Sequence, residues 1–388
     1  EKLNLPFLKQ IGQGSFSDCR ISSVNLPSLI SIGNSGFSNC RSLKKFVAEK
    51  IQQVGSKCFS NCTLLSNINC KLEAESLTCP GCDGCPVCYH DVAFCLQRGR
   101  SGLENYVKID EQMLDKVLKK YNIGITVQQA LDAEEGSIIN ECLVLKEEHY
   151  QIRAFYENND FKYVLALRLR HVAKSMFRNG WNMTTAIMPE AVGVLYGSFE
   201  YTNLKICFFP KLVRIDGIAF SNCKIQGLNF QNFSALQSVG QNGFSGCPLT
   251  YANLPALIQL GENVFECCKD LKWFSASNVE QIGKNCFSYC PLLSSVNCDQ
   301  QPEKFVCFDQ YRNKKCGLCP VCKGEIAECL RRGTAPRKLK KLQKVENSHL
   351  TSVLALLEYQ LGECEQISRI WSTFQVLQRE LENALEFE

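Results

Sequence analysis

Cysteine is the residue type in this chain whose number and spacing could do chemistry: 25 of its 388 residues are cysteines. The densest run is "CPGCDGCPVC", residues 79 to 88, in which four cysteines follow one another at three-residue intervals. Thiolates at such spacing bind metal ions, form disulfides or carry out redox chemistry. The four histidines stand in no pattern typical of a nucleophilic or metal-dependent enzyme, and the sequence contains no glycine-rich phosphate loop. We therefore expect no enzymatic activity.

This run belongs to a six-cysteine module that occurs twice. Residues 1 to 79 match residues 229 to 307 at a constant offset of 228, and after a six-residue insertion the match resumes at an offset of 234. The first copy contains Cys70, Cys79, Cys82, Cys85, Cys88 and Cys95, and the second contains Cys298, Cys307, Cys316, Cys319, Cys322 and Cys329. We interpret each module as a structural element that closes a repeat array.

The chemistry of the module stays open at this stage. Six cysteines suit three disulfides in an oxidising compartment. Structural zinc suits the module equally well, and its best candidate ligands are the pairs Cys85 with Cys88 and Cys319 with Cys322. Cys79 and Cys82 are two residues apart, but Cys307 and Cys316 are eight apart, so this pair is not expected to be one rigid metal-binding unit. An iron–sulfur or redox role is a third alternative.

Seven segments share a Phe-x-x-Cys motif: "QIGQGSFSDC", "SIGNSGFSNC", "QVGSKCFSNC", "RIDGIAFSNC", "SVGQNGFSGC", "QLGENVFECC" and "QIGKNCFSYC". An eighth segment, "GVLYGSFEYT", keeps Phe199 but has Thr202 in place of the cysteine. The period is 21 to 24 residues, which indicates a solenoid of stacked repeats. The cysteines of these repeats are expected to be free, buried thiols that act as small apolar residues.

This pattern, with its "IG", Phe, Cys and "LP" elements, resembles the BspA-like leucine-rich repeat family. The resemblance covers roughly half of the chain. It implies a repeat protein that binds other proteins, often at a cell surface. The predicted function is a non-catalytic interaction or adhesion scaffold that is on the cell surface or secreted. The alternative is an intracellular protein, in the cytoplasm, that uses its Cys-x-x-Cys modules for zinc binding or thiol redox chemistry.

The predicted fold is an α+β repeat protein with two leucine-rich repeat arrays, each closed by a cysteine module and joined and followed by helices. Helices are expected near 110 to 124, 126 to 157 and 160 to 179. The predicted domains are array A (1–69, whose N-terminal repeats we expect to be missing from this chain), a first cysteine-rich cap (70–102), a helical spacer (103–182), array B (183–297), a second cap (298–334), and a basic linker with a helical tail (335–388).

The repeat strands follow a Leu-x-x-φ-x-φ pattern (φ, an apolar residue), and alternation turns the apolar positions inward. In array B this places Tyr251 and Trp273 next to each other on the outer face. Aromatic residues beside basic ones on an exposed sheet are typical anchors of an interface. The predicted surface comprises Lys205, Ile206, Phe208, Tyr251, Lys272 and Trp273. The alternatives are that the helical spacer covers these rings or that the strand register is shifted by one residue.

The expected partner is a protein or a surface glycan. The net charge of +4 is too small to indicate a nucleic-acid partner, and no apolar run is long enough to span a membrane. Apolar residues at spacings of three and four from Leu350 to Leu381 allow a helix-mediated dimer, although a helix that folds back on the protein has the same pattern.

Overall fold

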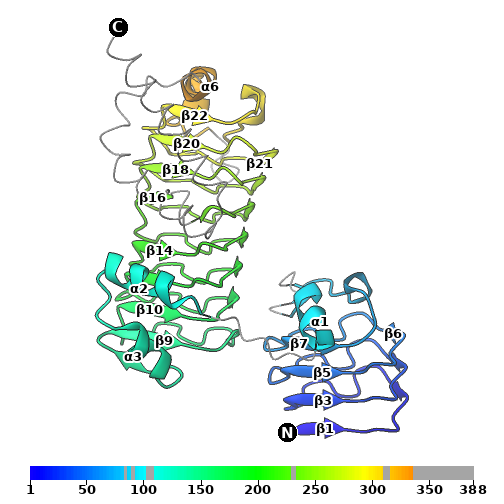
Figure 1. Cartoon of the computed structure of the whole chain (residues 1–388). Coiled ribbons are helices and arrows are strands. Elements are labelled where there is room, and N and C mark those ends of the chain that lie inside the picture. The colour runs from blue at the N-terminus through cyan, green and yellow to red at the C-terminus, as the bar shows by residue number, and fades with distance from the viewer. Residues whose placement is uncertain (83–84, 89–91, 102–108, 229–232, 309–314, 335–388) are drawn as a thin grey trace, which may run out of the picture. The chain divides into compact units, whose positions relative to one another are not determined.

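The computed structural model describes residues 1–82, 85–88, 92–101, 109–228, 233–308 and 315–334. Short parallel strands form two stacks, which we call the first array (residues 2–69) and the second array (residues 138–297) (Figure 1). Each is a solenoid of parallel strands, as the repeat period predicts. The predicted tail and its dimerisation lie outside the described residues.

The first array contains two parallel sheets, in the orders β1-β3-β5-β7 and β2-β4-β6. Their strands are β1 (Lys2–Asn4), β2 (Gln10–Ile11), β3 (Ser23–Asn25), β4 (Ser31–Ile32), β5 (Lys45–Val47), β6 (Gln53–Val54) and β7 (Asn67–Asn69).

The second array has one face formed by the sheets β8-β9-β10-β12-β14 and β16-β18-β20-β22 and another formed by β11-β13-β15-β17-β19-β21. All pairs are parallel except β8 with β9. The strands are β8 (Ile138–Ile139), β9 (Cys142–Leu145), β10 (Tyr163–Ala166), β11 (His171–Val172), β12 (Thr185–Ile187), β13 (Gly193–Val194), β14 (Ile206–Phe208), β15 (Arg214–Ile215), β16 (Gly227–Leu228), β17 (Ser238–Val239), β18 (Tyr251–Asn253), β19 (Gln259–Leu260), β20 (Trp273–Ser275), β21 (Gln281–Ile282) and β22 (Ser295–Asn297).

Within the described residues, helices are few and short. They are η1 (Ala74–Ser76), α1 (Val92–Ser101), α2 (Glu111–Lys120), α3 (Val127–Asp132), η2 (Pro302–Lys304), α5 (Pro320–Lys323) and α6 (Ile326–Thr334). The expected helix near residue 110 is confirmed, because the Asp110 side chain caps α2 by accepting a hydrogen bond from the Met113 N–H at 2.8 Å.

Stacked phenylalanines form the core of each rung, by which we mean one repeat of an array. In the second array Phe155, Phe177, Phe199, Phe220, Phe244, Phe265 and Phe287 stack in sequence, with centroids 5.1 to 6.0 Å apart. Phe16, Phe37 and Phe59 also stack in the first array, with centroids 5.2 and 6.3 Å apart. Offset stacking at this separation is the favourable arrangement for aromatic rings. The rings therefore set the rung spacing from inside the solenoid.

The residue two positions after each of these phenylalanines has a left-handed backbone, with positive φ. It is Asn39 or Asn61 in the first array and Asn179 or Asn222 in the second, for example. Asparagine and aspartate tolerate this conformation better than most side chains, which explains the "FSN" and "FSD" spellings of the repeat. Its N–H points along the array and donates to the carbonyl of the next rung, as from Asn39 to Ser60 at 2.7 Å.

The predicted helices at 126–157 and 160–179 are wrong beyond α3. Strands β9, β10 and β11 occupy this region, so the second array begins well before residue 183. Phe155 and Phe177 complete two further rungs in which Asn158 and Gly180 replace the cysteine of the motif. Because these two repeats lack the motif cysteine, they do not match the Phe-x-x-Cys pattern.

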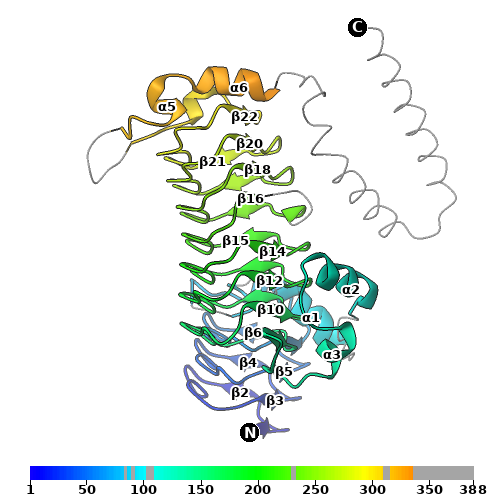
Figure 2. The ribbon, with the colours of Figure 1, turned by 90° about the vertical axis from the view of Figure 1, so that its left-hand side faces the viewer.

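The helix predictions failed because strands β9 and β10 are buried on both faces. In β9 and β10 the inward side chains, such as Leu143 and Val164, join the solenoid core. The outward ones, such as Val144 and Leu165, pack in a second cluster with apolar residues of α2 and α3. Figure 2 shows these two helices beside β10, β12 and β14. A strand buried on both faces has a continuous apolar sequence, which periodicity does not distinguish from a helix.

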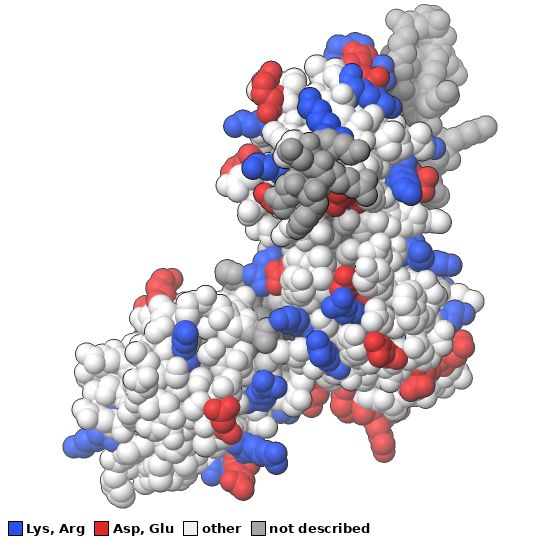
Figure 3. All heavy atoms as spheres, turned by 180° about the vertical axis from the view of Figure 1, so that it is seen from behind, with Lys and Arg blue, Asp and Glu red and all other residues white. Residues whose placement is uncertain are grey.

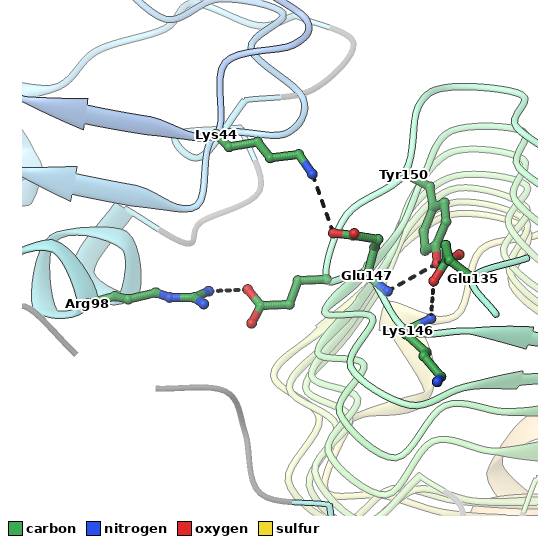
Figure 4. Close-up of polar contacts among 7 residues, drawn as sticks. Lys44, Arg98, Glu135, Lys146, Glu147 and Tyr150 are labelled. Atoms are coloured by element: carbon green, nitrogen blue, oxygen red, sulfur yellow. Dashed lines mark hydrogen bonds and ion pairs between the residues drawn. The ribbon is translucent and has the colours of Figure 1, made fainter. Parts of the chain in front are cut away.

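The turn between α3 and the second array is fixed by one carboxylate. Glu135 accepts hydrogen bonds from the Tyr150 hydroxyl and from the Lys146 backbone N–H (Figure 4). The helices that cover the outer face are thereby tied to the first rungs of the array.

Each array ends under a helix. Helix α1 packs on β7, the last strand of its sheet in the first array, and α6 packs on β22 in the second. Each helix contacts the backbone of the strand beneath it at a glycine. A Cβ on Gly99 would lie 2.1 Å from the Ile68 carbonyl oxygen, and one on Gly333 would lie 2.1 Å from that of Val296. Neither site has room for a larger residue.

Substitution Gly99→Ala should therefore destabilise the chain by roughly 1–3 kcal/mol through overpacking, although alanine alone would favour a helix by about 1 kcal/mol. Urea unfolding of the full chain measures this change in free energy. The exposed Gln97→Ala in the same helix is the control and should stay within about 0.5 kcal/mol of the parent. A more stable Gly99→Ala variant would contradict the close packing.

Candidate binding surface and cysteine clusters

Two aromatic side chains lie side by side on the outer face of the second array. Tyr251 opens β18, Trp273 opens β20, and the two residues are register partners. Their inward neighbours Ala252 and Phe274 are fully buried, whereas both aromatic residues are half-buried. Gly227 is the partner of Tyr251 on β16, and a Cβ there would lie 2.5 Å from the tyrosine ring. The strands have the register in which both rings face outward.

The other predicted surface residues fall in two groups. Lys205 and Lys272 are exposed, and each directly precedes a strand of this face. Ile206 and Phe208 are half-buried in β14, and Phe208 packs against the apolar cluster that contains α2 and α3. Helical cover therefore reaches Phe208. The members of that cluster come from α2, α3, their connections and the face of β8, β9, β10, β12 and β14, and they include neither Tyr251 nor Trp273.

The charges on the described surface have no single sign. On the face drawn in Figure 3, lysine and arginine side chains lie among aspartates and glutamates, and wide areas carry neither. The net charge of +4 agrees with this mixture. The described surface on that side gives no basic stripe of the kind that binds nucleic-acid phosphates.

Four of the six cysteines of each module gather in one place. The first cysteine cluster is Cys79, Cys82, Cys85 and Cys88, and the second is Cys307, Cys316, Cys319 and Cys322. In each cluster the four Sγ atoms all lie within 4.8 Å of one another. The candidate pairs Cys85 with Cys88 and Cys319 with Cys322 are thus each half of a larger set. Cys79 with Cys82 and Cys307 with Cys316 supply the other half of each cluster, although the two pairs differ in their spacing along the chain.

Backbone N–H groups surround the clusters. In the first, Cys82 Sγ accepts from the Asn61 N–H at 3.3 Å and lies 3.6 Å from Cys88 Sγ. In the second, Cys316 Sγ accepts from the N–H groups of Tyr289 at 3.4 Å and Leu318 at 3.5 Å. Burial raises the pKa of Cys316, but these two N–H groups, together with the N–H and thiol of Cys319, outweigh it and lower the pKa to about 6.

The remaining module cysteines lie apart from the clusters, in the apolar core. Cys95 of α1 and Cys329 of α6 place their thiols 3.7 Å from the carbonyl oxygens of Leu65 and Leu293, beneath the helices. Cys70 and Cys298 are buried next to the last strands. The 24 described cysteines form no disulfide bond with one another in this structure.

The motif cysteines of the repeats are buried, as expected, except for the half-buried Cys19, and several of them are also hydrogen-bond donors. Cys223, Cys247 and Cys290 place their thiols 3.0 to 3.1 Å from the carbonyl oxygen of the phenylalanine one rung earlier. Thr202, which replaces the motif cysteine, donates its hydroxyl to the Phe199 carbonyl at 2.9 Å. Burial raises the pKa of Cys223 to about 12, so this thiol stays protonated and able to donate at neutral pH.

The comparisons with known proteins agree with this architecture. A model of the BspA type leucine rich repeat region matches residues 1–79, 146–225 and 194–316, in six copies. No curated protein matches the chain. No described helix is long and apolar enough to cross a membrane.

Several solved structures are similar to the chain, and three of them follow. A leucine-rich repeat protein from Bacteroides ovatus has 16% identity and a TM-score of 0.34, covering 78% of this chain and 70% of its own. A leucine rich cell surface protein from Faecalibacterium prausnitzii has 15% identity and a TM-score of 0.22, with coverages of 78% and 89%. The pneumococcal vaccine antigen PcpA has 13% identity and a TM-score of 0.25, with coverages of 77% and 62%.

The burial of the repeat thiols predicts their reactivity. In the native chain at neutral pH, iodoacetamide should label Cys247 at least roughly tenfold more slowly than Cys19, which has the same motif position but is only half-buried. Mass spectrometry of the digested chain measures both rates, and unfolding in urea should make them equal. Rapid labelling of native Cys247 would show that its rung is open.

Proposed function

Because this chain belongs to the family of BspA-type leucine-rich repeat proteins, we propose that it is a non-catalytic scaffold that binds a protein ligand on the outer face of the second array. The adjacent pair Tyr251 and Trp273 is the observation that carries this proposal. Proteins of the family act in general as interaction or adhesion scaffolds. A position at the cell surface or outside the cell stays a prediction from that resemblance.

The chemistry of the pair suits an interface. Tyrosine and tryptophan are enriched among the residues that dominate binding energy, because they bury a large rigid area and carry a polar group. Tyr251 and Trp273 begin neighbouring parallel strands, which lie about 4.8 Å apart, so one ligand can reach both half-buried rings. Lys272 is exposed directly beside Trp273 and would favour a ligand with acidic groups near its apolar contact.

The helices divide the outer face into two parts. Helices α2 and α3 cover strands β9, β10, β12 and β14, including Phe208. Strands β18 and β20 follow further along the same face, outside the cluster that these helices form. We therefore place the ligand over β16, β18, β20 and β22 and leave Phe208 out of the binding surface that the sequence predicted.

The test replaces both anchors in the double variant Tyr251→Ser/Trp273→Ser. Interface anchors each contribute about 2 kcal/mol or more, so captured ligand should fall roughly 30-fold or more while the melting temperature changes little. The immobilised full chain is offered a cell extract, and captured proteins are quantified by mass spectrometry against the parent chain.

The matched control is Trp181→Ser/Tyr196→Ser, which removes the same two residue types from sites that are 53% and 47% exposed and lie outside these strands. It should capture the same proteins as the parent. Equal loss in both variants would place the ligand elsewhere, and a collapse in stability of the Tyr251→Ser/Trp273→Ser variant would assign its two rings to the core.

A further inference from the structure

We propose that each cysteine cluster binds one zinc ion through four thiolates and that this metal site completes the last rung of its array. The proposal is independent of the ligand-binding surface, because it concerns the ends of the arrays. It rests on the geometry of the eight sulfur atoms and on the hydrogen bonds that join them to the repeats.

The sulfur separations fit a tetrahedral ion. Zinc–sulfur bonds of about 2.3 Å place neighbouring thiolates about 3.8 Å apart in a tetrahedral site. The distances are 3.6 Å for Cys316 to Cys322 and 3.5 Å for Cys319 to Cys322, and every pair in either cluster lies within 4.8 Å. A disulfide needs about 2.0 Å. An iron–sulfur cluster binds its thiolates to different iron atoms, which requires a wider set.

The clusters replace a hydrogen bond that the other rungs make to their neighbours. In each inner rung, the N–H of the left-handed residue donates to a carbonyl of the next rung at 2.7 to 3.0 Å, as from Asn39 to Ser60 and from Cys267 to Ser288. At the last phenylalanine rung of each array, the same N–H donates to a cluster sulfur instead. Asn61 donates to Cys82 and Tyr289 donates to Cys316.

A hydroxyl makes the same connection one residue earlier in the chain. Ser288 Oγ lies 3.0 Å from Cys307 Sγ, and the equivalent Ser60 Oγ lies 3.9 Å from Cys79 Sγ. Backbone and hydroxyl groups that surround metal-bound sulfur orient it and disperse its negative charge. The last rung thus supplies the outer shell of the metal site, and the thiolates supply acceptors for the last rung.

The donor set also defines the kind of site. Four sulfur ligands leave no open position on a tetrahedral ion, so the zinc is structural and activates no water. The duplication repeats the whole arrangement, because Ser60, Asn61 and Cys79 match Ser288, Tyr289 and Cys307 at the offset of 228. Two ions per chain follow from this.

Metal analysis of the purified full chain tests the proposal. We expect two zinc ions per chain, one in Cys85→Ala, one in Cys319→Ala and none in the double variant. Cys95→Ala and Cys329→Ala are the matched controls, because they remove module cysteines outside the clusters, and both should keep two ions. Iron in place of zinc, disulfides among the cluster cysteines, or zinc retained in the double variant would overturn the proposal.

Two measurements use the unmodified chain and so do not depend on how a variant folds. Cobalt loaded after removal of the native metal should give the absorption spectrum of a tetrahedral sulfur site, and an octahedral spectrum would contradict the geometry. Metal removal should also speed amide exchange of Asn61 and Tyr289 by at least about tenfold while Asn39 and Cys267 change little. Equal protection with and without metal would show that the metal does not complete the rung.

Discussion

Hydrogen bonds that run along the array, from each rung to the next, are the constraint on which this structure depends. A strand or turn in a solenoid has its donors and acceptors directed at its neighbours, and an unpaired buried N–H costs about 1–3 kcal/mol. The stacked phenylalanines fix the rung spacing at which these bonds form. Both the choice of asparagine at the left-handed position and the construction of the array ends follow from this requirement.

Cysteine takes part in these hydrogen bonds in two ways, as a donor in the repeats and as an acceptor in the clusters. In the repeats, its thiol is small enough to be buried beside the phenylalanine and donates to a carbonyl of the preceding rung, as Cys247 does toward Phe220. In the clusters, the sulfur accepts from the last rung, as Cys316 does from Tyr289. Burial without accepted hydrogen bonds favours the thiol, whereas several N–H donors favour the thiolate.

Local signals made much of this fold predictable. The repeat motif contains the stacked ring, the left-handed residue and the thiol within four consecutive positions, so each rung that keeps all three was identified from sequence. The rungs of Phe155 and Phe177 lack the cysteine, and the strands before them are apolar on both faces. Nothing within these segments shows that α2 and α3 cover them, because that contact is made by a different part of the chain.

The candidate sites also contain features that follow from the local sequence and features that depend on distant parts of the chain. Outward orientation of Tyr251 and Trp273 follows from strand alternation alone, and the structure places them in that register. Coverage of Phe208 depends on a distant helix and was not predictable from its own strand. The four-sulfur clusters were not predictable from spacing along the chain. Cys307 and Cys316 are separated by a longer segment than Cys79 and Cys82, yet the two pairs occupy equivalent positions in the fold.

Gly99 and Gly333 give the terminal helices a property that the repeats do not have. Each helix lies on the backbone of the last strand, through contacts that depend on no particular inner rung. A helix packs in the same way on the last strand of both arrays. The number of repeats can therefore change in evolution by gain or loss of whole rungs, while the terminal helix keeps the same contacts with the last strand. An insertion of part of a repeat would displace the terminal helix from the last strand. Natural variation in array length should therefore occur in steps of one full repeat.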